Sequence, residues 1–151
     1  LTIIIVIHKS NIFEKLYNRA QEMDSDIVRC NFSCVYTQKG VEKTEQYDYP
    51  EESYMVSDKN WIYQKVSDNS ISCVIWNHIY KREFLKKHNV SFLDSRNICS
   101  EDSIFFLEAY LHCEKFDTVS DYLYYHVFHN TNTIIDRQKA EYLFLRNCSL
   151  F

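Results

Sequence analysis

The chain has 151 residues and a mass of 18.2 kDa, a length typical of one domain. Hydrophobic residues make up 46% and charged residues 25% of it, the composition of a folded globular protein. The net charge of −4, with no block of basic residues, argues against nucleic-acid binding. With one Gly and one Pro in all, the chain cannot contain a Gly-rich phosphate-binding loop. We therefore expect one globular domain over residues 1–151.

The longest apolar run, residues 3–7, is far shorter than the roughly 20 residues needed to cross a bilayer. No basic segment precedes this run and no small-residue cleavage site follows it, so it is not typical of a signal peptide. The six cysteines lack both the paired spacing of a zinc site and the density of a small secreted scaffold. These features predict a cytoplasmic protein with reduced thiols and no transmembrane segment.

The first half of the chain begins with a strand-like segment. Residues 1–7 are apolar apart from Thr2, which is typical of a strand buried on both faces, as in a parallel sheet. Apolar residues then recur with helical spacing over residues 12–23. Residues 26–37 alternate between apolar and polar, and a turn leads into a second strand over residues 41–49, which predicts a β-hairpin near a sheet edge. A short helix is expected over about residues 58–62.

The second half is richer in helix. One or two helical turns are expected over residues 83–88. A longer helix over residues 101–113 has apolar side chains on nearly every face, which indicates a buried helix. Two strand-like pieces follow over residues 116–120 and 122–128, and a closing helix is expected near residues 138–150. This order of strands and helices predicts an α/β or α+β fold.

Two pairs of residues could take part in chemistry. Glu101 and Asp102 follow Ser100, a plausible N-cap, and negative charge in a first turn is stabilised by the helix dipole. Asp102 could instead line a cleft as a carboxylate base. Trp76 and Asn77 combine a large ring with an amide, which could bind a sugar or could serve packing and a turn. The residues alone leave both alternatives open.

Histidine and cysteine pairs are weaker candidates for metal ligands. His126 and His129 are three residues apart, so in one continuous strand their side chains would lie on opposite faces. Cys30 and Cys34 share a strand face, but four extended residues separate them by roughly 13 Å, too far for a disulfide or a shared metal ion. We expect the cysteines to be core thiols, and we assign no metal ligands.

Five blocks of sequence, in order, resemble the second half of family-two glycosyltransferases. They contain the pairs Trp76-Asn77 and Glu101-Asp102 and cover residues 73–85, 89–92, 100–106, 122–126 and 132–134. Residues 13–17 and 24–28 are also similar to the helix and strand that follow the metal-binding loop of that family. The resemblance extends over about nine tenths of the chain, and it is the ordered set, not any single block, that gives it specificity.

This resemblance implies a fold, a reaction and a set of roles. The fold would be an α/β, partial GT-A-like mixed sheet flanked by helices, lacking the N-terminal nucleotide-binding strands. The family enzyme transfers a sugar from a nucleotide-sugar donor to a glycan or lipid-linked acceptor with inversion. The catalytic residues would be Asp102, as the base, and its neighbour Glu101. Trp76 and Asn77 would bind the acceptor, and a lipid-linked acceptor would allow peripheral membrane association.

The sequence departs from the family pattern at the donor side. The complete family enzyme uses a divalent metal ion, Mg²⁺ or Mn²⁺, held by an Asp-x-Asp motif, and no such motif or other ligand for the ion is identified here. The usual Lys after Trp-Asn is His78, and the Arg often found after the Tyr-rich strand is Val127. These departures predict that residues 1–151 alone do not turn over a sugar nucleotide.

Two functions follow from this comparison, and one physical alternative. The first is the C-terminal acceptor part of a glycosyltransferase whose donor half is upstream or has been lost. The second is a non-catalytic, degenerate remnant that acts as a glycan-binding or assembly module. The third possibility is that an exposed hydrophobic flank makes the chain self-associate.

Overall fold

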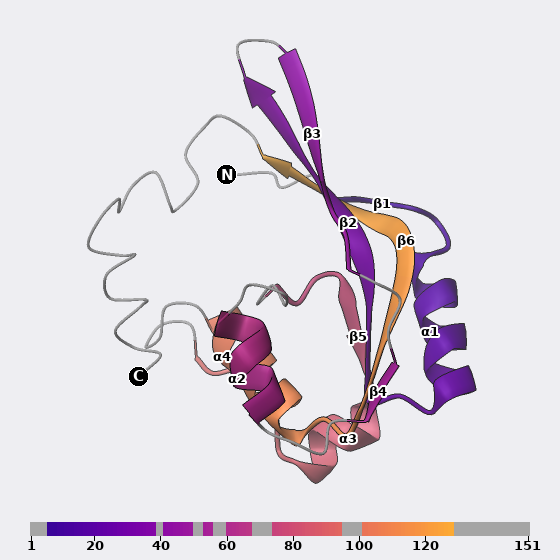
Figure 1. The fold of residues 1–151 in the computed structure, drawn as a ribbon, viewed down its shortest axis with the longest axis vertical. Coiled ribbons are helices and arrows are strands. Elements are labelled where there is room, and N and C mark those ends of the chain that lie inside the picture. Colours follow the sequence, from indigo (N-terminus) through magenta and orange to yellow (C-terminus); the bar gives the residue numbers. More distant parts are fainter. Residues whose placement is uncertain are drawn as a thin grey trace.

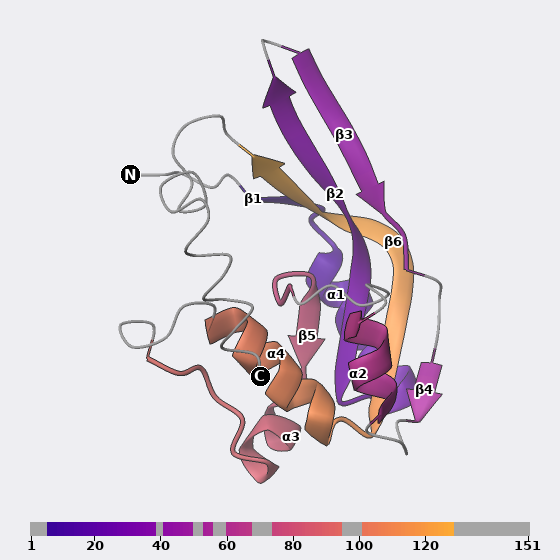
Figure 2. The same ribbon diagram turned by 60° about the vertical axis from the view of Figure 1, so that its left-hand side comes forward.

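The computed structural model describes residues 6–38, 41–49, 53–55, 60–67, 74–94 and 101–128. Its elements in chain order are β1 (Val6–His8), α1 (Ile12–Met23), β2 (Ile27–Gln38), β3 (Val41–Tyr47), β4 (Ser53–Met55), α2 (Asn60–Ser67), β5 (His78–Tyr80), α3 (Arg82–Lys87), α4 (Glu101–His112) and β6 (Lys115–Phe128). The six strands form one sheet, with the main order β1-β6-β2-β3, to which β4 adds on β6 and β5 on β2. Helix α1 covers one side of this sheet, and α2 and α4 lie on the other side (Figures 1 and 2). The expected α/β fold, a mixed sheet flanked by helices, is confirmed.

Strand β2 is the centre of the sheet, and the alternation of its side chains divides the core in two. Val28, Cys30 and Phe32 belong to a cluster with Leu16 of α1. Ile27, one residue earlier, belongs to a second cluster formed with α3, α4 and β6. Because neighbouring residues of a strand point to opposite faces, one strand supplies both layers of the core. Strand β2 also pairs antiparallel with β3, which lies at one end of the main strand order, so the predicted hairpin near a sheet edge is confirmed.

Strand β6 corrects the prediction of two separate pieces over residues 116–128. It is a single strand that runs parallel to β2, with two successive shifts in register on either side of the pair Asn31↔Tyr122. Ser120 and Asp121, the residues of β6 at the first shift, are exposed. Polar residues at this point signal a bulge, which bends a strand without ending it. The break inferred from the sequence was therefore wrong.

The shortest strands also differ from expectation. Strand β1 pairs antiparallel with β6, through Val6↔His126 to His8↔Tyr124, so the parallel arrangement inferred for the first segment was wrong. Residues 1–5 lie outside the described part of the chain. Strands β4 and β5, three residues each, were not predicted, because so short a run contains no measurable periodicity.

The helices predicted for the described part of the chain are present. Helix α4 buries five side chains of its 12 residues, which agrees with the buried helix inferred from the sequence; they are Ser103, Phe105, Phe106, Ala109 and Tyr110. Helices α2 and α3 extend a little differently from the predicted ranges, as helix ends commonly do. The cap Ser100 and the closing helix expected near residues 138–150 lie outside the described residues.

Helix α1 ends at a charged junction. Asp24 adopts a left-handed conformation with φ 50°, which Asp tolerates better than most residues, and its N–H donates to the carbonyl of Ala20. Its carboxylate accepts hydrogen bonds from Lys81 Nζ at 2.7 Å and Lys115 Nζ at 2.8 Å. These two ammonium groups, Lys115 foremost, lower the pKa of Asp24 to about 2. Asp24 thus connects α1 with β6 and with the turn between β5 and α3.

In the described part of the chain, none of the helices has the length and apolar character that crossing a membrane requires.

Candidate functional site

Both predicted catalytic residues lie in the first turn of α4. Glu101 and Asp102 are half-buried. The Oδ1 atom of Asp102 accepts a hydrogen bond from the backbone N–H of Ser103 at 2.8 Å. The carboxylate is thus held beside the N-terminal N–H groups of the helix, where the helix dipole stabilises negative charge. A carboxylate that accepts one such bond can still accept others, or take up a proton. Asp102 therefore has the chemistry that a general base needs.

Trp76 lies in a cluster of aromatic rings above the central strands. Its indole is stacked on Tyr124 with ring centroids 4.2 Å apart and on His126 with centroids 5.1 Å apart. The ring of Phe32 meets the indole edge to face, with centroids 4.7 Å apart, and the ring of Tyr47 is in turn stacked on Phe32. Trp76 remains half-buried within this cluster. Its predicted contact with an acceptor sugar stays a prediction.

Asn77 is completely buried and bonded to the central strand. Its Nδ2 donates to the carbonyl of Cys30 at 2.7 Å, and its own carbonyl accepts the backbone N–H of Cys30 at 2.9 Å. The side chain therefore fixes the turn before β5 against β2. Its Oδ1 is buried too and has no hydrogen-bond partner among the described residues. An acceptor-binding role for Asn77 would use this oxygen, and it also stays a prediction.

His78 connects the turn at Trp76-Asn77 with helix α4. Its Nε2 lies 2.9 Å from the hydroxyl of Tyr110, and its ring meets Phe106 edge to face at 5.9 Å. Burial, and then the positive charge of Arg29, lower the pKa of His78 well below its usual value. The imidazole is therefore neutral at pH 7, in the position where the family pattern has a Lys.

The structure ties the two predicted pairs together only indirectly. Asp102 precedes Phe106 by four residues, so its Cα lies one helical turn, about 6 Å along the axis, from the residue whose ring contacts His78. His78 in turn directly follows Asn77. Trp76, by contrast, packs against the cluster around Val28, whereas Phe106 belongs to the cluster around Ile27. The contacts of His78 with Phe106 and Tyr110 are therefore the link between the turn at Trp76-Asn77 and the helix that carries Glu101 and Asp102.

Sequence reasoning missed Arg29, which is buried in the centre of the sheet. Its guanidinium lies 3.8 Å from the centroid of the Tyr49 ring and 4.9 Å from that of Phe116, both cation–π contacts. Its Nε donates to the hydroxyl of Thr118 at 3.1 Å. A signal for it was present in the sequence: the residues of β2 that alternate with its apolar face are polar, and they are buried as well. A polar face on a central strand indicates a buried polar network.

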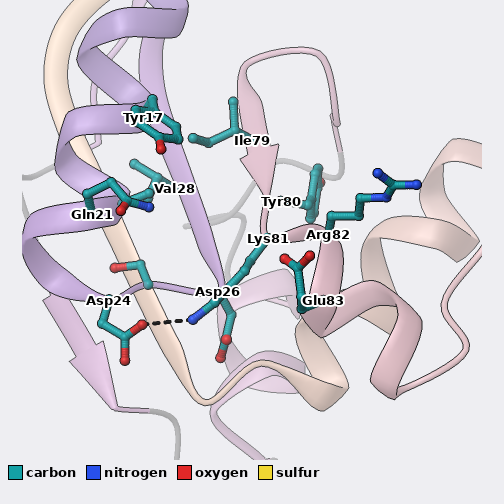
Figure 3. Close-up of a pocket in the computed structure, with 12 residues that line it drawn as sticks. Tyr17, Gln21, Asp24, Asp26, Val28, Ile79, Tyr80, Lys81, Arg82 and Glu83 are labelled. Carbon is teal, nitrogen blue, oxygen red and sulfur yellow. Dashed lines mark hydrogen bonds and ion pairs between the residues drawn. The ribbon is translucent and has the colours of Figure 1, made fainter.

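A cavity of about 370 Å³ opens between α1, β5 and the start of α3 (Figure 3). Tyr17, Asp24, Ile79, Lys81 and Glu83 are among the residues that line it, and the ion pair of Asp24 with Lys81 crosses its floor. Helix α1, one of its walls, covers the face of the sheet opposite to α4 (Figure 1). None of the four predicted site residues lines this cavity.

The described residues contain no ready-made cluster of metal ligands. Among them, no three side chains of the His, Cys, Asp or Glu type come together as metal ligands. His126 is packed on Trp76, and burial lowers its pKa, while His129 lies outside the described residues. Cys30 and Cys34 are free, buried thiols, and burial raises the pKa of Cys30 to about 12. The Mg²⁺ or Mn²⁺ ion that the family resemblance implies stays a prediction for the complete enzyme, since one or two carboxylates together with substrate phosphates can hold such an ion.

Comparison with known proteins supports a glycosyltransferase-like chain. No protein-family model matches it. Its fold is similar to that of S. aureus TarS 1–349 in complex with UDP-GlcNAc, with a TM-score of 0.60 and 17% identity, over 84% of this chain and 33% of that chain. The complex of TarS 1–349 with UDP gives a TM-score of 0.57 and 17% identity, over 82% of this chain and 33% of that one.

The chain is also similar in sequence to one characterised enzyme. The chain is 26% identical over 124 residues to the cholesterol galactosyltransferase of Borreliella burgdorferi, a match that covers 77% of this chain and 33% of that protein. The chain thus spans about a third of the length of the proteins that it matches. The chain is thus similar in sequence to a galactosyltransferase and in fold to a protein with bound UDP-GlcNAc, which makes it glycosyltransferase-like over the part that it shares with them.

Proposed function

We propose that the chain is the acceptor-side part of an inverting, family-two glycosyltransferase of GT-A type. The donor would be a nucleotide sugar, and the acceptor a glycan or a lipid-linked molecule. The main support is the 26% identity to a cholesterol galactosyltransferase over 124 residues, together with a fold similar to that of TarS bound to UDP-GlcNAc. A lipid-linked acceptor would bring the protein to a membrane surface without a spanning helix. The reaction itself would take place on the cytoplasmic side, where nucleotide sugars are made available.

In the proposed reaction, Asp102 is the general base. The acceptor hydroxyl oxygen attacks the anomeric carbon of the donor sugar while its proton passes to a carboxylate oxygen of Asp102. The bond between the anomeric carbon and the nucleoside diphosphate breaks on the opposite side, which inverts the configuration. Because a sugar hydroxyl is a weak acid, proton transfer must accompany bond formation, and general-base catalysis of this kind contributes about 10²- to 10⁴-fold. Glu101, on the same turn, would help to position the acceptor.

The acceptor would bind beside Trp76 and Asn77. An indole face suits the apolar face of a pyranose ring, and a buried amide oxygen can accept a hydrogen bond from a hydroxyl. The unpartnered Oδ1 of Asn77 is the atom that would do so, once the acceptor displaces what covers it. No three candidate ligands for the divalent ion expected in the complete enzyme come together among the residues described, so no step is assigned to this ion.

The proposal is tested with the complete natural protein and a panel of radiolabelled sugar nucleotides. We expect transfer by the wild type and a loss of about 10²- to 10⁴-fold in kcat for Asp102→Asn. Glu108→Gln, six residues further along α4, is the matched control and is expected to retain activity. Equal transfer by Asp102→Asn and wild type would refute the base assignment. A fall in kcat with Glu101→Gln, but not with Asp102→Asn, would assign the role of general base to Glu101 instead.

A specific observation favours the second candidate, a non-catalytic glycan-binding or assembly module. His78 stands where the family pattern has a Lys, and its pKa is lowered well below the usual value, so it supplies no positive charge at pH 7. Calorimetry of the complete protein with UDP and Mn²⁺ separates the two functions. Heat of binding supports the enzyme, and a titration without heat, at concentrations where glycans do bind, supports the module.

A further inference from the structure

Strand β3 has one edge that no described strand covers. Along its other edge it pairs with β2 over seven residue pairs, from Phe32↔Tyr47 to Gln38↔Val41. The hairpin of β2 and β3 projects beyond the rest of the sheet (Figures 1 and 2). All residues of β3 are exposed except Glu45, which is half-buried. Within the described part of the chain, its backbone therefore presents an unpaired row of N–H and C=O groups along this edge, and such an edge can pair with another strand.

The geometry of an antiparallel edge limits which pairings are possible. In such a strand the N–H and C=O of one residue point to one side and those of the next residue point to the other side. Alternate residues of β3 therefore bond to β2, and only the others face outward. If a second copy of β3 pairs antiparallel with the first, outward-facing residues must lie opposite outward-facing residues. The residue numbers of every opposed pair must then add up to an even number.

Charge selects one of the registers that remain. When the two strands are centred on Thr44, Lys43 of each copy lies opposite Glu45 of the other. All seven residues of β3 then overlap, and Val41 lies opposite Tyr47 of the second copy. The neighbouring even registers, centred on Lys43 or Glu45, place two ammonium groups or two carboxylates directly opposite each other. Unlike charges opposite each other stabilise a strand pair, and like charges destabilise it.

The side chains needed for this pairing are already arranged on one face. Lys43 Nζ and Glu45 Oε1 lie 2.6 Å apart within a single copy, with exposed fractions of 69% and 41%. In the paired state the two residues of each copy would form a square of four alternating charges. Val41, with 68% of its surface exposed, and Tyr47, with 39%, would bury apolar surface against each other at both ends of the interface. Charged residues on an edge usually oppose pairing, but this pattern opposes other registers and favours its own antiparallel copy.

We propose that two copies of this protein associate through β3, antiparallel and centred on Thr44, to form one sheet that continues across the dimer. The interface has two-fold symmetry, because the same strand of each copy supplies both sides of every contact. One strand pair buries less than the roughly 1,600 Å² of a standard interface, so the dimer is weak and concentration-dependent. The proposal does not depend on the proposed function, because β3 contains none of the proposed site residues.

Sedimentation velocity of the complete protein over a concentration series tests this proposal. We expect a monomer–dimer equilibrium for the wild type. Lys43→Glu and Glu45→Lys should each weaken association at least about tenfold, because each places like charges opposite each other in both symmetric pairs. An equimolar mixture of the two variants should associate again, since two carboxylates on one copy would then face two ammonium groups on the other. Only an interface between copies predicts this recovery.

Two controls separate the interface from effects on folding. Glu42→Lys changes the net charge as much as Glu45→Lys but faces Gln46, so it should leave the equilibrium nearly unchanged. Far-UV circular dichroism checks that each variant folds. A wild type that is monomeric at every concentration would overturn the proposal, and so would single variants that associate as the wild type does.

Discussion

His78 is hydrogen-bonded to Tyr110 between β5 and α4, and the burial of its imidazole makes folding sensitive to pH. Because burial lowers the pKa of His78 in the folded protein, the native state stays neutral while the unfolded chain takes up a proton near pH 6.5. The contribution of the neutral His78 imidazole to the free energy of unfolding is therefore fully present above pH 6.5, and it is lost as the pH falls toward the folded-state pKa. The loss is at most about 1.4 kcal/mol per pH unit.

We expect His78→Gln, which can still bond to Tyr110, to flatten this dependence. Urea unfolding at about pH 7, 6 and 5 measures it as the difference in slope between wild type and variant. His112→Gln is the control, because it removes an exposed imidazole and leaves the buried pair intact. Parallel pH curves for wild type and His78→Gln would show that the imidazole titrates freely.

At this scale, residue types could be predicted but their surroundings could not. The sequence correctly indicated that Cys30 and Cys34 are core thiols, since burial of a strand face follows from alternation. It gave no sign that Asn77 bonds to the backbone of Cys30, 47 positions earlier. Such a contact depends on the register of β5 against β2, and three residues cannot specify a register.

At the scale of elements, the turn before β5 is the connection that the candidate site depends on. Asn77 supplies the side-chain hydrogen bond that holds this turn to β2. Asn77→Ala removes the donor to the carbonyl of Cys30 and leaves a cavity, so we expect a loss of about 1 to 3 kcal/mol in the free energy of unfolding. Denaturant unfolding measures this loss. Asn18→Ala, at an exposed position of α1, should change stability by no more than about 0.5 kcal/mol.

The same variant distinguishes two roles of Asn77. If its amide serves mainly the acceptor, Asn77→Ala would retain full stability and raise KM in the transfer assay. A stability loss with an unchanged KM would assign it to the fold alone.

Elements with strong periodicity were predictable, and those defined by long-range pairing were not. Helix α1 and strand β2 each contain enough residues to show a period of about 3.6 or 2, and the long, almost wholly apolar stretch of α4 indicates a buried helix. β6 was divided in two because Ser120 and Asp121 resemble a turn, although pairing with β2 keeps the strand continuous. The cavity at Asp24 could not be foreseen either, because α1, β5 and α3 form it only after folding.

For the whole molecule, the two core clusters lie on opposite faces of one sheet and share the strand β2. Leu16, 1% exposed, lies in the cluster on the α1 side, and Phe106, fully buried, lies in the cluster on the α4 side. Since both clusters pack on the same strands, neither layer can open without exposing its buried face of β2 and β6 and weakening the strands on which the other layer packs. The fold should therefore unfold as one cooperative unit.

Leu16→Ala and Phe106→Ala test this cooperativity. We expect losses of about 2 to 5 kcal/mol and about 3 to 5 kcal/mol in the free energy of unfolding, from lost burial and from the cavities left behind. The two residues belong to different clusters. If the double variant still folds, its loss in the free energy of unfolding should therefore equal the sum of the two single losses within about 0.5 kcal/mol. Tryptophan fluorescence and far-UV circular dichroism should report the same transition for each variant. Transitions that separate, with Leu16→Ala affecting only one of them, would show that the two faces of the sheet fold independently, and the contact of His78 with α4 could then open without unfolding the α1 side.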